Sequence, residues 1–152
     1  MTVRGQLPHL SLRRAYPAPP DVVFRAFTEP ALLERWFRPS PEVVIEVAKL
    51  DLRVGGGYRF VFRFPDGRRA VVLGEYRAIE RPQRVAFTWT WEAPDPHAGI
   101  DTLVTVDLNE KDGGTELVLT HASFPNEEVM RQHQHGWGAV LDALSGLAEI
   151  SG

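Results

Sequence analysis

The chain has 152 residues, 43% hydrophobic and 24% charged, which is ordinary globular composition and predicts one domain over residues 1–152. Its net charge of −3 comes with no basic stripe and no apolar run long enough to cross a membrane, so we expect neither nucleic acid nor membrane as a partner. There is no cysteine and no signal-peptide pattern, which excludes disulfides and thiol chemistry and favours a cytoplasmic protein.

The N-terminal part predicts one strand followed by two short helices. Residues His9–Tyr16 alternate as a strand does, and Pro20 suits the first position of a helix because its missing N–H would be unpaired there. Thr28 is placed to cap a second helix that has Pro30 in its first turn. The apolar residues of the two helices recur on one face: Val23, Ala26, Phe27, Leu33, Trp36 and Phe37.

The middle of the chain predicts an antiparallel meander. Six further segments read as strands: Glu42–Val54, Tyr58–Phe64, Ala70–Ile79, Val85–Trp91, Ile100–Lys111 and Thr115–Ala122. Turn residues separate them, as in Pro65-Asp66-Gly67. Alternation places large aromatic side chains on one face of this sheet.

The last segment predicts one long helix over Asn126–Glu149. Asn126 is a favourable N-cap, and about 24 residues would span roughly 36 Å, enough to cross a small domain. One face of this helix is apolar: Met130, Trp137, Leu141, Leu144 and Leu147 or Ala148. Gly136 and Gly138 flank Trp137, which indicates either close packing or room beside the indole for a ligand.

This order of elements predicts an α+β protein. A curved antiparallel sheet of six to seven strands has one apolar face, and the C-terminal helix is the element large enough to cover it. A curved sheet wrapped on a helix leaves space between them, which aromatic side chains either fill or line.

Several sequence segments together resemble one superfamily, from about Leu10 to Leu147. They are Ala18–Thr28, Leu33-Glu-Arg-Trp-Phe37, Asp51–Gly56, Gly74-Glu-Tyr76, Pro82–Trp89, Gly114–His121 and Gly136–Leu141. The chain resembles the SRPBCC or START-like superfamily, and within it the family of the heat-shock protein 90 ATPase activator. The resemblance implies a helix-grip fold. Members of the superfamily bind lipids, hormones or polyketides, and a few are cyclases or hydrolases.

The resemblance and the aromatic face together give a first hypothesis, a protein that binds a hydrophobic or aromatic small molecule between sheet and helix. The candidate ligand-binding residues are Trp36, Tyr58, Phe60, Phe62, Tyr76, Phe87, Trp89, His121, Trp137 and Leu141. We expect no cofactor. A homodimer is compatible with the sequence. The eukaryotic co-chaperone carries a further N-terminal domain without a counterpart here, so a chaperone partner is not expected.

Two alternatives stay open. One is a cyclase- or hydrolase-like enzyme in the same cavity, with His121 as acid–base and Tyr76 or Glu75 assisting. The other is a stress-related co-chaperone or interaction module with a filled core. Strand periodicity turns His121 inward if Leu117 and Leu119 face inward. We assign no catalytic residue and regard a binding protein as the better interpretation.

The remaining polar residues predict little chemistry. Asp51 and Arg53 lie two apart and predict an ion pair at a turn or an anchor for a ligand. His133 and His135 point about 200° apart on a helix and cannot bind one metal ion together, so no metal site is expected. We expect His97, next to Asp95, to be solvated. Sequence pattern leaves open which face Glu75, Tyr76 and Asp107 take.

Overall fold

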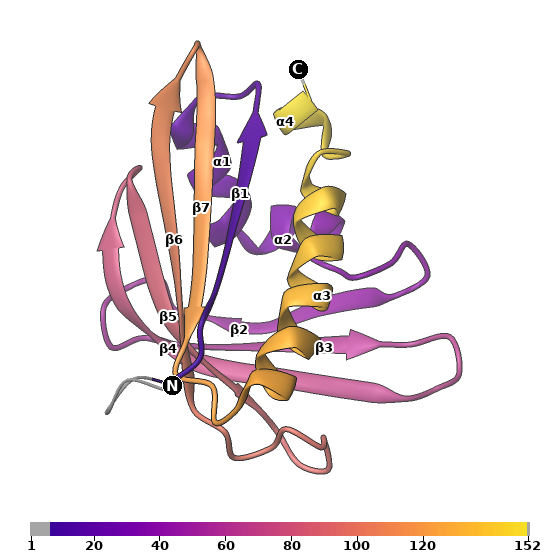
Figure 1. The fold of residues 1–152 in the computed structure, drawn as a ribbon. Helices are drawn as coiled ribbons and strands as arrows, with labels where there is room; N and C mark the ends of the chain where they lie inside the picture. The colour runs from indigo at the N-terminus through magenta and orange to yellow at the C-terminus, as the bar shows by residue number, and fades with distance from the viewer. Residues whose placement is uncertain (1–6, 152) are drawn as a thin grey trace.

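The computed structural model describes residues 7–151, and its main element is a seven-stranded antiparallel sheet (Figure 1). The strand order is β1-β7-β6-β5-β4-β3-β2. The bounds are β1 (Leu10–Tyr16), β2 (Val44–Leu50), β3 (Gly57–Arg63), β4 (Arg69–Glu80), β5 (Arg84–Trp91), β6 (Thr102–Lys111) and β7 (Gly114–Ala122). The predicted α+β helix-grip fold is therefore confirmed.

The sheet bends strongly around its inward face. In Figure 1, β1, β6 and β7 run up one side while β2, β3 and β4 run across beneath a long helix. Register shifts at Val47/Lys49 in β2 and at Tyr76/Ala78 in β4 supply irregularities of the kind that bend a sheet. Gly74 permits close approach of β4 and β5, because a Cβ there would collide with the carbonyl group of Thr88.

The strand faces follow the predicted period of two. In β7, Leu117, Leu119 and His121 are buried and point inward, as expected. The register places His121 between Leu10 of β1 and Val104 of β6. The core is continuous along this inward face and extends to the helices.

Strand β2 is shorter than the predicted segment Glu42–Val54. It ends at Leu50 because the next residues form a turn, in which Arg53 N–H donates to the carbonyl of Asp51 and Gly56 N–H donates to that of Arg53. The other strand ends differ from the prediction by one or two residues.

Two short helices, α1 (Pro20–Thr28) and α2 (Pro30–Trp36), follow β1 as predicted. The predicted cap was wrong. Thr28 is the last residue of α1, and its hydroxyl donates to the carbonyl of Phe24 at 2.8 Å. Glu29 occupies the N-cap of α2 without a side-chain cap bond.

The long helix α3 (Glu127–Leu144) crosses the hollow of the sheet (Figure 1). The side chain of Asn126 accepts a hydrogen bond from Val129 N–H at 2.9 Å, which confirms the predicted N-cap. Its predicted end at Glu149 was wrong: the 18-residue helix, about 27 Å long, gives way to a turn over residues 145–147. Gly146 lies in that turn and is a poor helix former.

After the turn, the short helix α4 (Ala148–Ser151) folds back onto the core. Leu147 and Ile150 are buried, whereas Ala148 is exposed. Burial of these two side chains offsets the loss of a continuous helix. Among residues 7–151, no helix combines the length and apolar character needed to cross a membrane.

Candidate functional site

A pocket of about 220 Å³ lies between the middle of α3 and the inward face of the sheet. From α3 it is lined by Gln132, His133, Gly136, Trp137 and Val140. These residues recur at steps of one, three or four, so they form a single stripe along the helix. The pocket therefore occupies the kind of space expected between a curved sheet and its helix.

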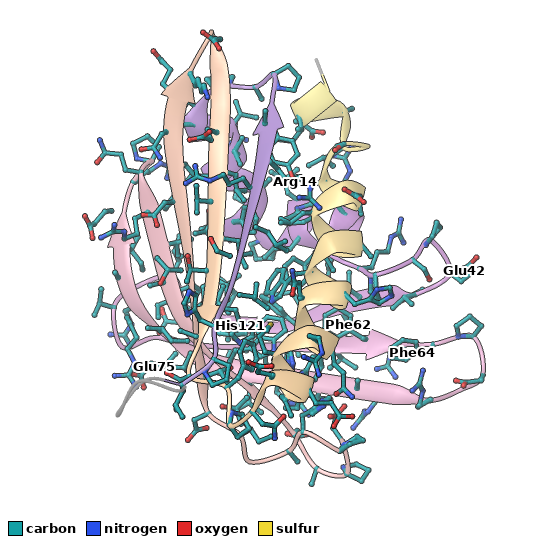
Figure 2. All side chains as sticks on the ribbon, in the orientation of Figure 1. Arg14, Glu42, Phe62, Phe64, Glu75 and His121 are labelled. Atoms are coloured by element: carbon teal, nitrogen blue, oxygen red, sulfur yellow. The ribbon has the colours of Figure 1, made fainter. Side chains whose placement is uncertain are left out.

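The sheet wall of the pocket is almost entirely aromatic. Its side chains come from β3, from the residue that follows β3, from β4 and β5, and from the segment after α2: Phe62, Phe64, Ala70, Trp89, Trp91, Phe37 and Pro39. The rings contact one another, with Trp89 and Trp137 centroids 5.0 Å apart and Phe62 and Trp91 centroids 6.0 Å apart. Figure 2 shows Phe62 and Phe64 along β3, on the side of the sheet that α3 covers.

The rim of the pocket is polar and comes from the loop between β5 and β6. Asp95 Oδ1 accepts a hydrogen bond from His97 N–H at 2.8 Å, which fixes the loop locally. His97 Nε2 lies 2.6 Å from Gln132 Oε1 of α3 and so links the loop to the helix. His97 is partly buried and lines the pocket, so our expectation of a solvated side chain was wrong.

His133 joins the rim to the aromatic wall. Trp91 Nε1–H donates to His133 Nε2 at 3.0 Å, and Nδ1 of the same ring lies 2.9 Å from the carbonyl of Val129. Because Nε2 accepts, Nδ1 carries the proton and donates to that carbonyl. Burial, the largest cause, lowers the pKa of His133, and nearby His97 lowers it further. The ring is thus a neutral bridge between helix and sheet.

Gly136 leaves open space on the helix side of the pocket. A Cβ built at Gly136 would meet no atom within 4 Å, while one at Gly138 would approach only the guanidinium of Arg14, at 3.9 Å. Only Gly136 of the two lines the pocket. Close packing therefore does not explain Gly136, and the interpretation as room beside Trp137 fits the geometry.

A second aromatic cluster on the same face is closed. Tyr58, Phe60, Tyr76 and Phe87 are all buried, and the space among them is about 10 Å³, too small to hold more than one water molecule. The Tyr58 hydroxyl donates to the carbonyl of Thr88. Burial raises the pKa of both tyrosines well above the usual value. These four candidate residues form core.

His121 is fully buried behind Trp137, and both of its ring nitrogens are used. Trp137 Nε1–H donates to His121 Nδ1 at 2.9 Å, so Nε2 carries the proton and donates to Thr102 Oγ1 at 2.6 Å. The Thr102 hydroxyl in turn donates to the carbonyl of Trp89 at 2.8 Å. Burial and the neighbouring His133 lower the pKa of His121 well below its usual value. No nitrogen is free to bind a ligand or move a proton.

Three of the candidate ligand-binding residues line the pocket: Phe62, Trp89 and Trp137. The others do not. Trp36 is buried elsewhere and donates to the carbonyl of Ala26 at 2.9 Å, and Leu141 is fully buried within the core. The remaining candidates belong to the closed cluster or to the His121 hydrogen-bond chain.

Sequence reasoning missed most of the rim. Phe64 and Trp91 belong to predicted strands whose alternation placed aromatic side chains on one face, and Gly136 indicated either close packing or room for a ligand, so these three lining residues were partly within reach of the pattern. Asp95 and His97 come from an irregular loop, which has no periodicity that predicts where its side chains point.

Of the three polar residues whose face the sequence left open, Tyr76 is buried, whereas Glu75 and Asp107 lie on the outer surface, as do Asp51 and Arg53. The carboxylate of Asp51 pairs with Arg53 at 2.7 Å, with both side chains exposed, which contributes little to stability. Glu75 is exposed and points away from α3 (Figure 2), and Asp107 pairs with Arg84 at 2.7 Å. Across residues 7–151, no three His, Asp or Glu side chains are grouped so that they could hold a metal ion.

Known proteins match both the sequence and the fold. The family model for Activator of Hsp90 ATPase homolog 1-like protein matches residues 17–149. The structure of protein CV1439 from Chromobacterium violaceum is 28% identical, covers 93% of this chain and 96% of its own, and has a TM-score of 0.82.

Two further structures are similar. The AHSA1 protein (SPO3351) from Silicibacter pomeroyi is 27% identical over 91% of this chain and 96% of its own, with a TM-score of 0.80. CalU16 from Micromonospora echinospora is 29% identical over 91% of this chain and 74% of its own, with a TM-score of 0.67. No curated protein matches the sequence. The family match covers most of the chain, which therefore belongs to the Activator of Hsp90 ATPase homolog 1-like family.

Proposed function

We propose that the protein binds a small, largely apolar and aromatic molecule in the pocket beneath the middle of α3. The observation that carries this proposal is the pocket itself: about 220 Å³ lined by aromatic rings, with Gly136 leaving the helix side open. A glycine inside a helix costs about 1 kcal/mol relative to alanine, so a site that keeps the space open has a cost in stability.

The neighbouring closed cluster supports the proposal by contrast. Tyr58, Phe60, Tyr76 and Phe87 show that aromatic residues on this sheet can pack with almost no space between them. The pocket next to them is therefore not a general result of packing large rings. Trp89 lines the pocket, and its Nε1 is buried without a hydrogen-bond partner among the described residues.

The expected affinity is modest. Burial of about 200 Å² of apolar ligand surface is worth roughly 5 kcal/mol before the costs of association are subtracted. For a purely apolar ligand this corresponds to a dissociation constant of about 0.2 mM at best. Polar contacts at the rim, where Asp95, His97 and Gln132 lie, would add affinity and orient the ligand.

The four tryptophans provide a direct test. We expect ¹H–¹⁵N NMR with 2-naphthalenemethanol to shift the indole N–H signals of Trp89, Trp91 and Trp137, which line the pocket. The signal of Trp36 should stay in place, because its N–H is bonded to Ala26 outside the pocket. Equal shifts of all four signals, or none at saturating ligand, would contradict the proposal.

A matched pair of variants tests the location. Gly136→Leu should fill the pocket and reduce the affinity for 2-naphthalenemethanol at least tenfold, as measured by calorimetry. Gly138→Leu lies two residues along the same helix but outside the pocket, and it should bind as the unmodified protein does. If both variants bind equally well, the ligand lies elsewhere.

The geometry gives no support to the enzymatic alternative that we considered. His121 has both nitrogens bonded inside the protein, Tyr76 is buried in the closed cluster, and Glu75 is exposed on the outer face. The three residues do not share a site. A module with a filled core is not favoured either, because the pocket is open.

A further inference from the structure

The polar side chains of the pocket lie at its rim rather than in its inner part, and the formal charge among them is negative. The inner part is lined by aromatic and aliphatic side chains, whereas all polar side chains lie at the rim: Asp95, His97, Gln132 and His133. Within residues 7–151, Asp95 is the only carboxylate that lines the pocket, and neither lysine nor arginine lines it.

Asp95 has capacity for another partner. Its Oδ1 accepts from His97 N–H at 2.8 Å and lies 3.6 Å from His97 Nδ1. No described residue donates a hydrogen bond to Oδ2, and no described arginine or lysine pairs with this carboxylate. About a fifth of the side chain is exposed (20%), so the group is held at the rim and is still accessible.

Two cationic side chains beside the pocket lining, Arg68 and Arg59, are already engaged. Arg68 stacks over the Phe64 ring at 4.3 Å, and its guanidinium lies 3.9 Å from the carboxylate of Asp66. Arg59 pairs with Glu92 at 3.2 Å. None of these four charged residues lines the pocket. An anionic ligand group would thus meet no lysine or arginine among the described lining residues and would face the carboxylate of Asp95.

The aromatic wall also favours a cationic ligand over an anionic one. The face of an aromatic ring is the negative part of its quadrupole, and tryptophan attracts a cation more strongly than phenylalanine or tyrosine does. Trp89, Trp91 and Trp137 all contribute to the wall, and Asp95 lies four residues after Trp91, in the loop that follows β5. The pocket thus combines three indole rings with one carboxylate.

Resting on the proposed function, we propose that the pocket selects by charge: its ligand is an aromatic molecule that carries a cationic amine, with the ring between α3 and the sheet and the ammonium at Asp95. Aromatic carboxylates and phenolates are excluded. The selection comes from one carboxylate, three indole rings and the absence of a lining cation.

Three probes of nearly equal shape test this: 2-naphthylmethylammonium, 2-naphthalenemethanol and 2-naphthoate, titrated by calorimetry at mildly alkaline pH. The amine should bind at least tenfold more tightly than the carboxylate, which corresponds to about 1.4 kcal/mol, with the alcohol between them. A carboxylate that binds as tightly as the amine would overturn the proposal.

Asp95→Asn separates charge from shape, because the amide oxygen can still accept from His97 N–H. It should reduce the ratio of amine to alcohol affinity at least tenfold, and an unchanged ratio would overturn the assignment of Asp95. Asp142→Asn removes a carboxylate from α3 outside the pocket and should leave the ratio unchanged.

If none of the probes binds, the proposed function fails as well. If the alcohol binds and the amine has no advantage over it, only the charge selection fails.

Discussion

The inward face of the sheet carries two aromatic clusters that differ in what covers them. The closed cluster, Tyr58, Phe60, Tyr76 and Phe87, encloses about 10 Å³, whereas the pocket a few residues along the same strands encloses about 220 Å³. Both contain large rings on neighbouring strands. Ring content alone therefore does not decide whether a cavity forms.

The covering helices account for the difference. Over the closed cluster, Phe27 of α1, Leu33 of α2 and Phe37 insert between the strand side chains. Over the pocket, α3 presents Gly136 where a side chain would otherwise insert. The two regions also differ in their polar groups: the hydroxyl of Tyr58 is satisfied internally, while the Asp95 carboxylate remains accessible.

Removal of one aromatic ring from each cluster should give the largest difference in the free energy of unfolding. Phe60→Ala should destabilise the protein by about 3–5 kcal/mol, because Phe60 is buried and its neighbours cannot collapse into the space. Phe64→Ala removes a half-buried ring at the pocket and should cost less than half as much. Urea unfolding measures both, and equal losses would show that the two regions are packed alike.

Stability should also depend on pH through the buried His121 and the half-buried His133, behind and beside the pocket. Burial lowers the folded-state pKa of His121 and His133 below the ordinary value, so between those pKa values and about 6.5 the unfolded chain binds more protons. Stability is therefore full above pH 6.5 and falls as the pH decreases below it, by roughly 1 kcal/mol per pH unit for each proton taken up.

Chemical denaturation at pH 7.5 and at pH 5.5 measures this slope. Exposed carboxylates contribute little in that range, because their ordinary pKa values lie near 4. His121→Gln, which can still hydrogen-bond with Thr102 or Trp137, should reduce the slope even if it lowers stability overall. A stability that stays constant across the range would contradict a neutral, buried His121.

The fold could be predicted from the sequence because periodicity and turn residues determine which side chains become buried. The period of two placed His121 inward, and Asn126 marked the start of α3 correctly. The end of α3 could not be predicted in the same way. Leu147 continues the apolar stripe in sequence, but it becomes buried through a turn that only the packing of α4 explains.

The pocket was much harder to predict than the fold. An inward aromatic residue has the same pattern whether it fills a core or lines a cavity, so Phe60 and Phe62 could not be separated by sequence. The rim depends on an irregular loop, where side-chain direction follows local hydrogen bonds such as that between Asp95 and His97. Gly136 was the one local signal of space.

The smallest predicted effect tests whether that space has a structural reason. Gly136→Ala should raise stability by up to about 1 kcal/mol, since alanine is the better helix former and the added Cβ meets no atom within 4 Å. Gly138→Ala should give a similar gain, because its Cβ would meet only the end of the Arg14 side chain. If structure alone mattered, the two glycines would be equivalent.

The Gly136→Ala and Gly138→Ala variants should differ in their affinity for the ligand. The methyl group at residue 136 enters the pocket and should weaken the affinity for 2-naphthalenemethanol severalfold, whereas alanine at 138 should leave it unchanged. Thermal unfolding and calorimetry on the same two variants separate the effects. A Gly136→Ala variant that is destabilised would show that packing requires the glycine, and one that is stabilised with full affinity would show that the ligand does not approach α3 at this residue.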